Sequence, residues 1–447
     1  MGTHQGIAIT AYRFTSRTAI SVVVANMIGT GVFTSLGFQL LDIDSAPVIL
    51  LLWFLGGCLA LCGALCYAEL GAALPRSGGE YNYMSRIYHP SVGFISGWIS
   101  TTIGFAAPTA LAAITAGRYL GAAVPDIPET LVAVALVISV SMFHIRSRQA
   151  SARFQELFTF IKVLLILAMI VAIGFVLETP QDIRWVPVEN DTRYLMSGGF
   201  AVALIFVNYA YTGWNAATYV AGEIETPSKV LPRVLIIGTG FVTLLYMALH
   251  VAFLAAAPMD QMAGKLEIGF VVAEVVFGEA TGRLVGILLA FLLISTVSAM
   301  TLAGPRALQM IGQDFRLLGF MARENRHGVP STAIISQTAI TVFLVVTATF
   351  DAVLVFAGAV LAVNTLFVVV GVAVLRVREP ELPRPFTVPL FPFPLLVFAG
   401  ITLWTLAYLV FERPMEIGFG LVVIASGWLF YWFGKRFGDR RVQDNQL

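Results

Sequence analysis

Charge is what this chain lacks most. Asp, Glu, Lys and Arg make up 12% of its 447 residues, about half the fraction that is usual in soluble proteins. The polar stretches are too short to build a separate soluble domain. Hydrophobic residues make up 58%, and apolar runs of about 20 residues recur along the whole chain, each long enough to cross a bilayer as a helix. The sequence therefore predicts an all-α polytopic membrane protein embedded in a lipid bilayer.

The signals of several other protein classes are missing as well. The formal net charge is only +1, which gives no reason to expect a nucleic-acid partner. No P-loop, HExxH or GxSxG motif occurs, and no pair of intramembrane aspartates suggests a protease, so we expect neither an enzyme nor a cofactor. The filter of an ion channel would show rings of acidic side chains or a carbonyl-lined loop, and neither is visible.

Cysteine is rare. The only three, Cys58, Cys62 and Cys66, are spaced so that they share one face of a helix. Neighbouring thiols on one helix cannot complete a tetrahedral metal site, and no histidine-rich segment accompanies them. We therefore expect no metal site and interpret the cysteines as small packing residues.

Twelve apolar stretches are predicted to span the membrane, and short segments at residues 1–16 and 435–447 flank them. The predicted spans are residues 17–38, 46–74, 92–122, 128–145, 154–177, 196–221, 231–257, 283–308, 331–350, 352–375, 390–411 and 415–434.

Basic residues are distributed unevenly about these spans. With the N-terminus in the cytoplasm, 20 of the 27 Lys and Arg residues lie in cytoplasmic segments, six lie in external segments, and Lys162 lies within a span. Because positive residues concentrate in cytoplasmic segments, both termini are expected to be cytoplasmic. We expect a multi-pass protein of the plasma (inner) membrane.

Two spans contain residues that suit a continuous helix poorly. The first carries Gly29-Thr30-Gly31 near its middle, and each Gly costs roughly 1 kcal/mol relative to Ala in a helix interior. The sixth carries Thr212-Gly213. Each span opens a block of five, residues 17–177 and 196–376, so the blocks have opposite orientations, as in an inverted repeat. Residues 390–434 form two spans outside the repeat. Interruptions at corresponding positions of two halves indicate a transporter's binding site.

A helix that unwinds in the middle of the bilayer frees backbone groups that lipid cannot satisfy. The start of the following half-helix presents donor amides and partial positive charge, which suit a carboxylate. Carbonyls released at the end of the preceding half-helix suit an ammonium group. Two such breaks side by side are predicted to bind the α-amino and α-carboxyl groups of an amino acid. The alternative is that Gly29 and Gly31 only allow helices to pack closely.

Four stretches resemble a known group of proteins: IGTGVF (28–33), YAELGAALPRSGGEYNY (67–83), YTGWNAATYVAGEIETPSKVLPR (211–233) and LRVREPELPRPFTVPLFPFP (375–394). The first three resemble the amino acid–polyamine–organocation superfamily, and the fourth resembles its L-type amino acid transporter branch. The resemblance runs through nearly all of the chain. It implies a leucine-transporter-like 5+5 inverted repeat with twelve transmembrane helices, of which helices 1 and 6 are interrupted, and alternating-access transport of amino acids.

The resemblance also implies roles for individual residues. The α-carboxylate is expected at the amides of Thr30 and Gly31 and at the Thr30 hydroxyl. The α-ammonium is expected at carbonyls of the two breaks. Tyr209 matches an aromatic gate on the outer side, although an interfacial or core tyrosine is the alternative. The predicted substrate site comprises Met27, Ile28, Gly29, Thr30, Gly31, Tyr209, Ala210, Thr212, Gly213, Asn215 and Asn364, and the expected ammonium acceptors are the carbonyls of Met27, Ile28, Tyr209 and Thr212.

Three of these positions bear on which amino acid is carried. Thr212 stands where many L-type members have a second glycine, and its bulk is expected to shrink the side-chain pocket. Asn364 matches a polar pocket position, or else hydrogen-bonds a neighbouring helix. Asn215 is neutral where relatives that move arginine or agmatine carry a carboxylate at or near this position. We therefore expect a small neutral amino acid as substrate.

Lys162 lies about two turns into the fifth span, where a buried lysine costs about 2.5–3.5 kcal/mol on insertion scales. It either snorkels to the cytoplasmic interface or has a partner. The resemblance implies that its ammonium takes the place of a sodium ion between spans 1 and 8, near the carbonyls of Ala25 and Ile28 and the hydroxyls of Ser295 or Ser298. The expected consequence is sodium-independent transport.

The cytoplasmic ends carry three further acidic residues of interest. Glu69 is expected to pair with a nearby Arg or to accept bonds from backbone amides, a structural role. Glu223 and Glu225, near Lys229 and Arg233, form either a salt-bridge network at an inner gate or a solvated loop.

Two expectations concern how the protein works. Exchange of one amino acid for another is the commoner mode in the L-type branch and is the preferred hypothesis, with proton-coupled symport as the alternative. A cationic amino acid or polyamine antiporter fits less well. The external loop 121–129, GAAVPDIPE, has no cysteine. Animal L-type transporters join an accessory glycoprotein through one there, so no disulfide-linked accessory subunit is expected, as in a prokaryotic protein that works alone.

Overall fold

The structure is a computed structural model that describes residues 15–437 except 125, 147 and 178; the side chains of residues 148–156 and 223 lie outside the description. The described part is helical throughout and contains no strand. The main helices are α1 (Ser16–Met27), α2 (Gly31–Gln39), α3 (Ala46–Ala73), α4 (Glu80–Ile87), α5 (Pro90–Ile99), the π-helical turn η1 (Ser100–Gly104), α6 (Ala106–Ala123), α7 (Glu129–Arg146), α8 (Arg148–Val176), α10 (Gly198–Ala210), α11 (Ala216–Tyr219), α12 (Pro227–Ala256), α14 (Ile268–Phe277), α15 (Glu279–Asp314), α16 (Ser331–Thr347), α17 (Phe350–Arg378), α18 (Phe393–Glu412) and α19 (Pro414–Phe437).

Every apolar stretch marked in the sequence coincides with one or more of these helices. Ten stretches of the described chain are long and apolar enough to cross a bilayer, and three shorter apolar helices, α10, α14 and α16, accompany them. Neither α14 nor the short α4 is predicted from the sequence, because an 8- or 10-residue helix beside longer apolar runs has too few turns to show a helical period. The chain is a polytopic membrane protein.

The outer surface of the bundle confirms this environment. Large apolar side chains point outward from the peripheral helices, among them Phe175 at the end of α8, 86% exposed, and Phe411 at the end of α18, 84% exposed. A monomer in water rarely exposes so much contiguous apolar surface. Lipid tails provide the apolar surroundings that these side chains need.

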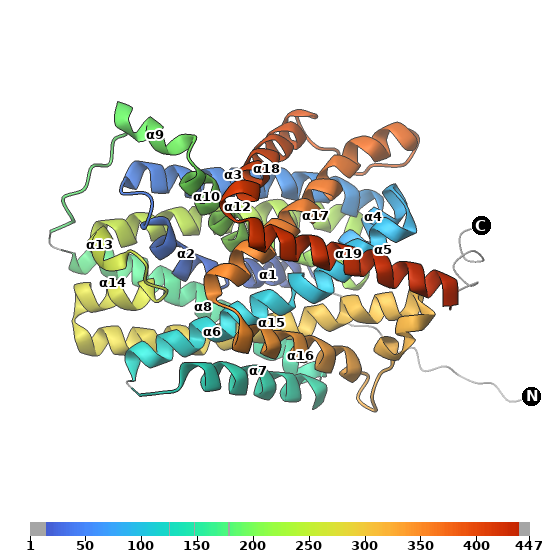
Figure 1. The fold of residues 1–447 in the computed structure, drawn as a ribbon, viewed down its shortest axis with the longest axis horizontal. Coiled ribbons are helices and arrows are strands. Elements are labelled where there is room, and N and C mark those ends of the chain that lie inside the picture. The colour runs from blue at the N-terminus through green and yellow to red at the C-terminus, as the bar shows by residue number, and fades with distance from the viewer. Residues whose placement is uncertain (1–14, 125, 147, 178, 438–447) are drawn as a thin grey trace, which may run out of the picture.

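Both predicted helix interruptions are present. α1 ends at Met27 and α2 begins at Gly31, so Ile28, Gly29 and Thr30 lie outside the helical ladder. α10 ends at Ala210 and α11 begins at Ala216. Figure 1 shows α1 and α10 near the centre of the bundle, with α7 and α16 along one edge. The two breaks therefore lie inside the protein and not against lipid.

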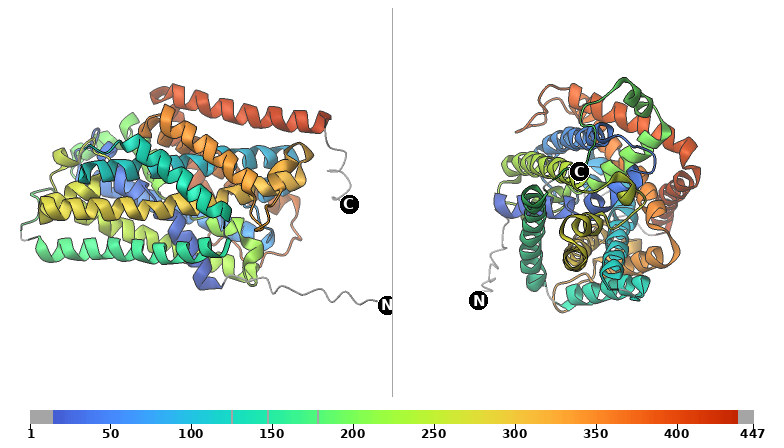
Figure 2. Two further views of the ribbon diagram at one scale, coloured as in Figure 1. Left: turned by 90° about the horizontal axis from the view of Figure 1, so that it is seen from below. Right: turned by 90° about the vertical axis from the view of Figure 1, so that its left-hand side faces the viewer.

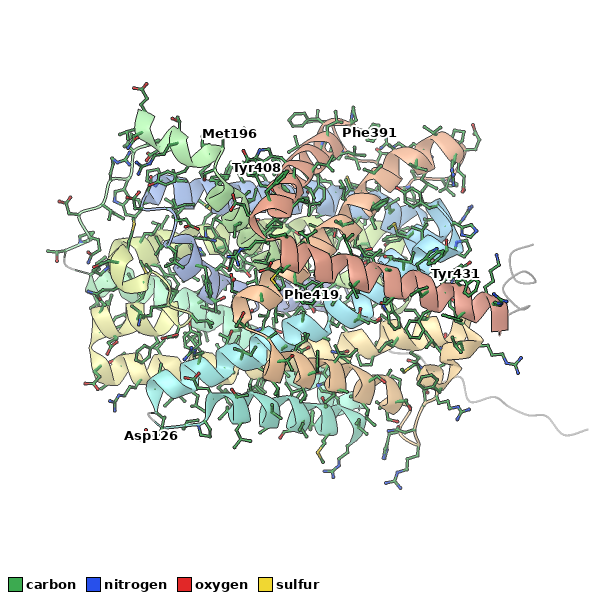
Figure 3. The ribbon with its side chains drawn as sticks, viewed as in Figure 1. Asp126, Met196, Phe391, Tyr408, Phe419 and Tyr431 are labelled. Atoms are coloured by element: carbon green, nitrogen blue, oxygen red, sulfur yellow. The ribbon has the colours of Figure 1, made fainter. Side chains whose placement is uncertain are left out.

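The last two long helices lie against the outside of this core. Figure 2 shows α19 running along one side of the bundle. Tyr431 of α19 packs beside the rings of Phe94 and Phe315 (Figure 3). On α18, the Tyr408 hydroxyl donates a hydrogen bond of 2.8 Å to the carbonyl oxygen of Met196. α18 and α19 thus pack against the core from outside.

A buried ion pair attaches the segment between α17 and α18 to α3. The Glu69 carboxylate, 2% exposed, accepts two hydrogen bonds from the Arg376 guanidinium, at 2.8 and 2.5 Å, and one of 2.7 Å from the backbone amide of Val388. Arg384 lies 3.6 Å from the same carboxylate. Both expected partners of Glu69, an arginine and a backbone amide, are confirmed together.

Replacing Glu69 with Gln is expected to destabilise the protein by on the order of 3 kcal/mol, because removing one partner of a buried pair leaves the other charge uncompensated. The measurement is the thermal unfolding midpoint of the purified protein in detergent. Glu279→Gln is the matched control, since Glu279 forms an exposed pair with Arg283 one turn away on α15, and such pairs contribute about 0.3–0.5 kcal/mol. Equal midpoints for the two variants would show that the Glu69 pair has no special structural role.

Candidate functional site

The two broken helices cross at their breaks, and glycine makes the crossing possible. A Cβ atom on Gly31 would lie 2.5 Å from the Cα atom of Ala210, and one on Gly213 would lie 2.6 Å from the backbone of Asn26. Gly213 also has φ +100°, a conformation that favours glycine. A Cβ on Gly29 would make only ordinary contacts, 3.7 Å from the Thr296 side chain and 3.9 Å from the carbonyl oxygen of Met27. Close packing therefore explains why Gly31 and Gly213 are glycines. Because both lie at helix breaks, close packing and a binding site at the breaks are compatible interpretations.

The start of α2 offers unused hydrogen-bond donors. The first amides of a helix have no acceptor within it, and no acceptor among the described residues is found for the amides of Thr30 and Gly31. The Thr30 hydroxyl also has no partner there, while the Thr30 carbonyl accepts from Thr34 and Phe33. This is the arrangement of donors and helix dipole that binds carboxylates.

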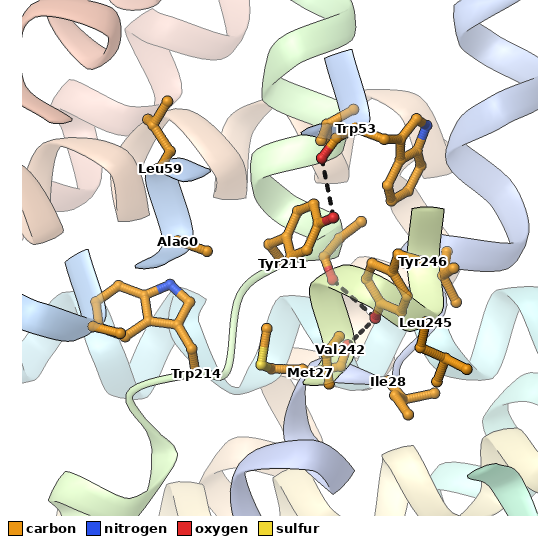
Figure 4. Close-up of a cluster of buried hydrophobic side chains, with 14 of the residues drawn as sticks. Met27, Ile28, Trp53, Leu59, Ala60, Tyr211, Trp214, Val242, Leu245 and Tyr246 are labelled. Atoms are coloured by element: carbon orange, nitrogen blue, oxygen red, sulfur yellow. Dashed lines mark hydrogen bonds between the residues drawn. The ribbon is translucent and has the colours of Figure 1, made fainter. Parts of the chain in front are cut away.

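Carbonyls at the ends of α1 and α10 form the other half of the site. The Tyr246 hydroxyl, from α12, lies 2.6 Å from the carbonyl oxygen of Met27 and 3.2 Å from that of Ala210 (Figure 4). It carries one proton and can donate to only one of them at a time. One side chain therefore contacts both breaks at once.

The four carbonyls expected to meet an ammonium group are not equally free. The Met27 oxygen also accepts from the amide of Gly29, and the Tyr209 oxygen accepts from both the amide and the hydroxyl of Thr212. A carbonyl oxygen has two lone pairs, so the Tyr209 oxygen is fully used, and the Met27 oxygen is fully used whenever Tyr246 donates to it. The Ile28 oxygen has one partner, and none is found for the Thr212 oxygen among the described residues. These two retain acceptor capacity.

Lys162 reaches the first break. Its side chain is 1% exposed, and its Nζ donates hydrogen bonds to the carbonyl of Ile28, at 2.7 Å, and to the hydroxyl of Thr296 on α15, at 2.9 Å. Lys162 does not snorkel to an interface, because buried partners hold its ammonium group. The ammonium links α8, the break in the first span and α15.

The predicted hydroxyl partners of Lys162 were wrong, and Ala25 makes no hydrogen bond with it. The Ser295 hydroxyl donates to the carbonyl of Leu292 in its own helix, and the Ser298 hydroxyl bonds to Nε2 of His144. Successive helical residues are rotated by about 100°, so only Thr296 presents its hydroxyl to Lys162. The prediction placed the hydroxyl partner of Lys162 on the correct turn of α15 but named the wrong residues.

The two sides of the breaks differ in exposure. Tyr209 is 4% exposed and packs in an apolar cluster with Phe206 and Phe350. Thr212 and Asn215, on the side of α11, are partly exposed. The Tyr209 side of the site is therefore covered by packed aromatic side chains, whereas Thr212 and Asn215 keep part of their surface exposed.

Two predicted polar residues have different surroundings. Asn364 of α17 is 3% exposed, and its Nδ2 has no hydrogen-bond partner, which contradicts the alternative that its amide group donates to a neighbouring helix. Nδ2 of Asn215 donates a hydrogen bond of 2.6 Å to Glu80. A carboxylate thus lies next to Asn215, although the residue itself is neutral.

The acidic residues after α11 show no gate network in the described part of the chain. Glu225 is exposed and forms no ion pair with Lys229 or Arg233, which are exposed too. The Glu223 side chain lies outside the description. For Glu225 the solvated-loop interpretation is the one that fits.

The sequence analysis missed Tyr246, Thr296 and Glu80. No local pattern distinguishes Tyr246 from other tyrosines in an apolar helix, and Thr296 differs from its neighbouring serines only in rotation about the helix. Glu80 follows Ser77-Gly78-Gly79, which reads as a polar loop. Only the structure shows that the Glu80 side chain is buried, and no feature of the sequence indicates it.

A polytopic helical bundle with two helices broken side by side at its centre has the architecture of a secondary transporter. The chain belongs to the amino acid permease family, which matches residues 14–433. Among curated proteins it is 29% identical over 441 residues to the mouse (Mus musculus) "Large neutral amino acids transporter small subunit 2", covering 93% of this chain and 80% of that protein. It is 27% identical over 424 residues to the human (Homo sapiens) "b(0,+)-type amino acid transporter 1", covering 92% and 86%. It is 27% identical over 431 residues to the mouse "Asc-type amino acid transporter 1", covering 93% and 80%.

Proposed function

We propose that the protein is a sodium-independent exchanger of small neutral L-amino acids that works by alternating access. Its spans form twelve transmembrane helices in a leucine-transporter-like 5+5 inverted repeat, residues 17–177 and 196–376, with residues 390–434 outside it. The paired breaks at the first and sixth predicted spans support this arrangement. The names of the relatives support the proposed transport of neutral amino acids: one is named as a large neutral amino acids transporter and another as an Asc-type amino acid transporter.

In the proposed binding mode the α-carboxylate accepts from the free amides of Thr30 and Gly31. The α-ammonium donates to the carbonyls of Ile28 and Thr212, the two with unused acceptor capacity. Charge complementarity at two opposed ends fixes the orientation of the zwitterion, and its side chain then extends toward the surrounding helices. Asn364, with its unpartnered amide, is the candidate polar contact there.

The observation that carries the proposal is the buried ammonium of Lys162 between Ile28 and Thr296. Its two hydrogen bonds link the first broken span to α15, at the place where the resemblance puts the sodium ion of sodium-coupled relatives. The protein then requires no sodium to hold these two elements together. Both termini are cytoplasmic in this proposal, the protein resides in the inner membrane, and Tyr209 closes the outer side of the site.

Transport by purified protein in liposomes tests the proposed mode. Labelled neutral amino acid is expected to enter only vesicles preloaded with unlabelled amino acid, equally in sodium and in choline buffers. Uptake into empty vesicles under an acid-outside gradient would contradict exchange and indicate proton symport. A current that does not saturate with substrate would indicate a channel.

Replacing Thr212 with Gly is expected to widen tolerance for larger side chains. The Thr212 side chain is partly exposed beside the sixth-span break and is held toward the Tyr209 carbonyl by a 2.7 Å hydrogen bond. Inhibition by Leu and Phe of labelled substrate exchange should strengthen about tenfold relative to inhibition by Ala, since one or two methylenes in a pocket are worth about 1–3 kcal/mol. Thr218→Ala, a threonine on the following turn, is the control. An unchanged competition panel would exclude Thr212 as the size filter.

A further inference from the structure

Glu80, the first residue of α4, is a buried carboxylate at which three separate parts of the fold meet. It is 3% exposed. Its Oε1 accepts hydrogen bonds from the hydroxyl of Tyr67 on α3, at 2.9 Å, and from Nδ2 of Asn215, at 2.6 Å. Its Oε2 accepts from the hydroxyl of Ser100 in η1, at 3.2 Å, and from the hydroxyl of Tyr219 at the end of α11.

This carboxylate has no cationic partner among the described residues, unlike Glu69, which pairs with Arg376. Burying a carboxylate is costly unless hydrogen bonds replace its hydration. Two carboxylate oxygens offer about four acceptor positions, and all four of Glu80 are filled by neutral donors. The carboxylate is therefore stabilised by dipoles alone, and a cation could bind it only by displacing one of these donors.

Asn215 is the donor to Glu80 that comes from the break in the sixth span itself. It follows Gly213 by two residues, and it is partly exposed, whereas Tyr67 and Ser100 are buried. Its amide occupies one acceptor position of Oε1 and fills the space beside it. A lysine or ornithine side chain that extends from the break toward Glu80 would have to displace this amide, and it would lose its own hydration in doing so.

We propose that Glu80 is a concealed subsite for a cationic side chain, and that Asn215 sets the specificity for neutral amino acids by occupying it. The inference rests on the proposed function, because it requires a substrate bound at the two breaks. It assigns the exclusion of cationic amino acids to a specific hydrogen bond and not merely to the absence of a carboxylate in the sixth span.

The test compares lysine and ornithine with norleucine, a neutral amino acid of similar length, as inhibitors of neutral amino acid exchange in proteoliposomes. In the wild type norleucine should inhibit more weakly than alanine, because Thr212 narrows the pocket, and both cations should inhibit more weakly still, by about tenfold or more. In Asn215→Ala the difference in inhibition between the cations and norleucine should shrink about tenfold or more. In the double variant Asn215→Ala/Glu80→Gln this difference should return to the wild-type value. Tyr219→Phe is the control: it removes a donor to Glu80 but keeps the ring in place, so the difference should stay as in the wild type.

The outcomes separate this inference from the proposed function. An Asn215→Ala protein that exchanges alanine but discriminates between the cations and norleucine as before overturns the inference, and so does equal inhibition by cations in the single and double variants. If Asn215→Ala is not recovered as a folded protein, Asn215→Ser gives the same comparison with a smaller truncation. A wild type that exchanges no neutral amino acid at all refutes the proposed function instead.

Discussion

Lys162→Ala is expected to lower the rate of amino acid exchange by about 10- to 100-fold. The variant leaves the buried Ile28 carbonyl without its donor and removes the link to Thr296. A hydrogen bond to a charged group is worth about 1.5–3 kcal/mol, and each 1.4 kcal/mol is a factor of ten in rate. The loss should appear as a lower maximal exchange rate per folded protein, because the ammonium positions the break and is not expected to bind the substrate.

The measurement is counterflow of a labelled neutral amino acid into preloaded liposomes, normalised to the monodisperse protein recovered. Thr296→Val should give a smaller decrease, since it removes one of the two bonds and keeps the volume. Ser295→Ala is the matched control on the same turn, because its hydroxyl bonds only to its own helix. Normal kinetics in Lys162→Ala would mean that the buried ammonium has no part in the transport cycle.

Gly31→Ala is expected to abolish transport. The added Cβ would lie 2.5 Å from the Cα atom of Ala210, a backbone contact that no side-chain rotation relieves. The two broken helices must then move apart, and the amides and carbonyls of the two breaks no longer face one substrate. Overpacking of this kind typically costs 1–3 kcal/mol, but the separation of the two half-sites should remove binding altogether.

Exchange and thermal stability are measured together for Gly31→Ala. Gly240→Ala on α12 is the control, because a Cβ there meets nothing within 4 Å. Gly29→Ala should have an intermediate effect, since its Cβ would make only ordinary contacts with the Thr296 side chain at 3.7 Å and the Met27 carbonyl oxygen at 3.9 Å. Full activity of Gly31→Ala would contradict the close crossing of the two helices.

The positions of the helices were largely predictable from the sequence. Apolar runs of the length of a bilayer are strong signals, and Gly29, Gly31 and Gly213 indicated the two breaks because glycine disfavours a helix wherever it stands. The π-helical turn η1 at Ser100–Gly104 was not predicted. Its sequence, STTIG, has no residue that requires this geometry, so the turn reflects packing with neighbouring helices.

Contacts between distant segments were much harder to predict. The burial cost of a lone lysine indicated that Lys162 needs a partner, and the resemblance directed attention to the correct turn of α15. The choice of Thr296 over Ser295 or Ser298 depends on helix rotation, which no sequence pattern specifies to within one residue. Tyr246 contacts Ala210, 36 residues away, and Glu80 contacts Asn215, 135 residues away, so only the folded chain reveals these contacts.

The central claim is that main-chain groups at the two breaks bind the α-amino and α-carboxyl groups of the substrate. Competition by blocked analogues in preloaded proteoliposomes tests it most directly. Alanine should inhibit exchange, whereas N-acetylalanine, which has no ammonium group, and alanine amide, which has no carboxylate, should each inhibit at least about a hundredfold more weakly, because each loses charge-assisted hydrogen bonds. Inhibition by either analogue at the concentration at which alanine acts would contradict the account.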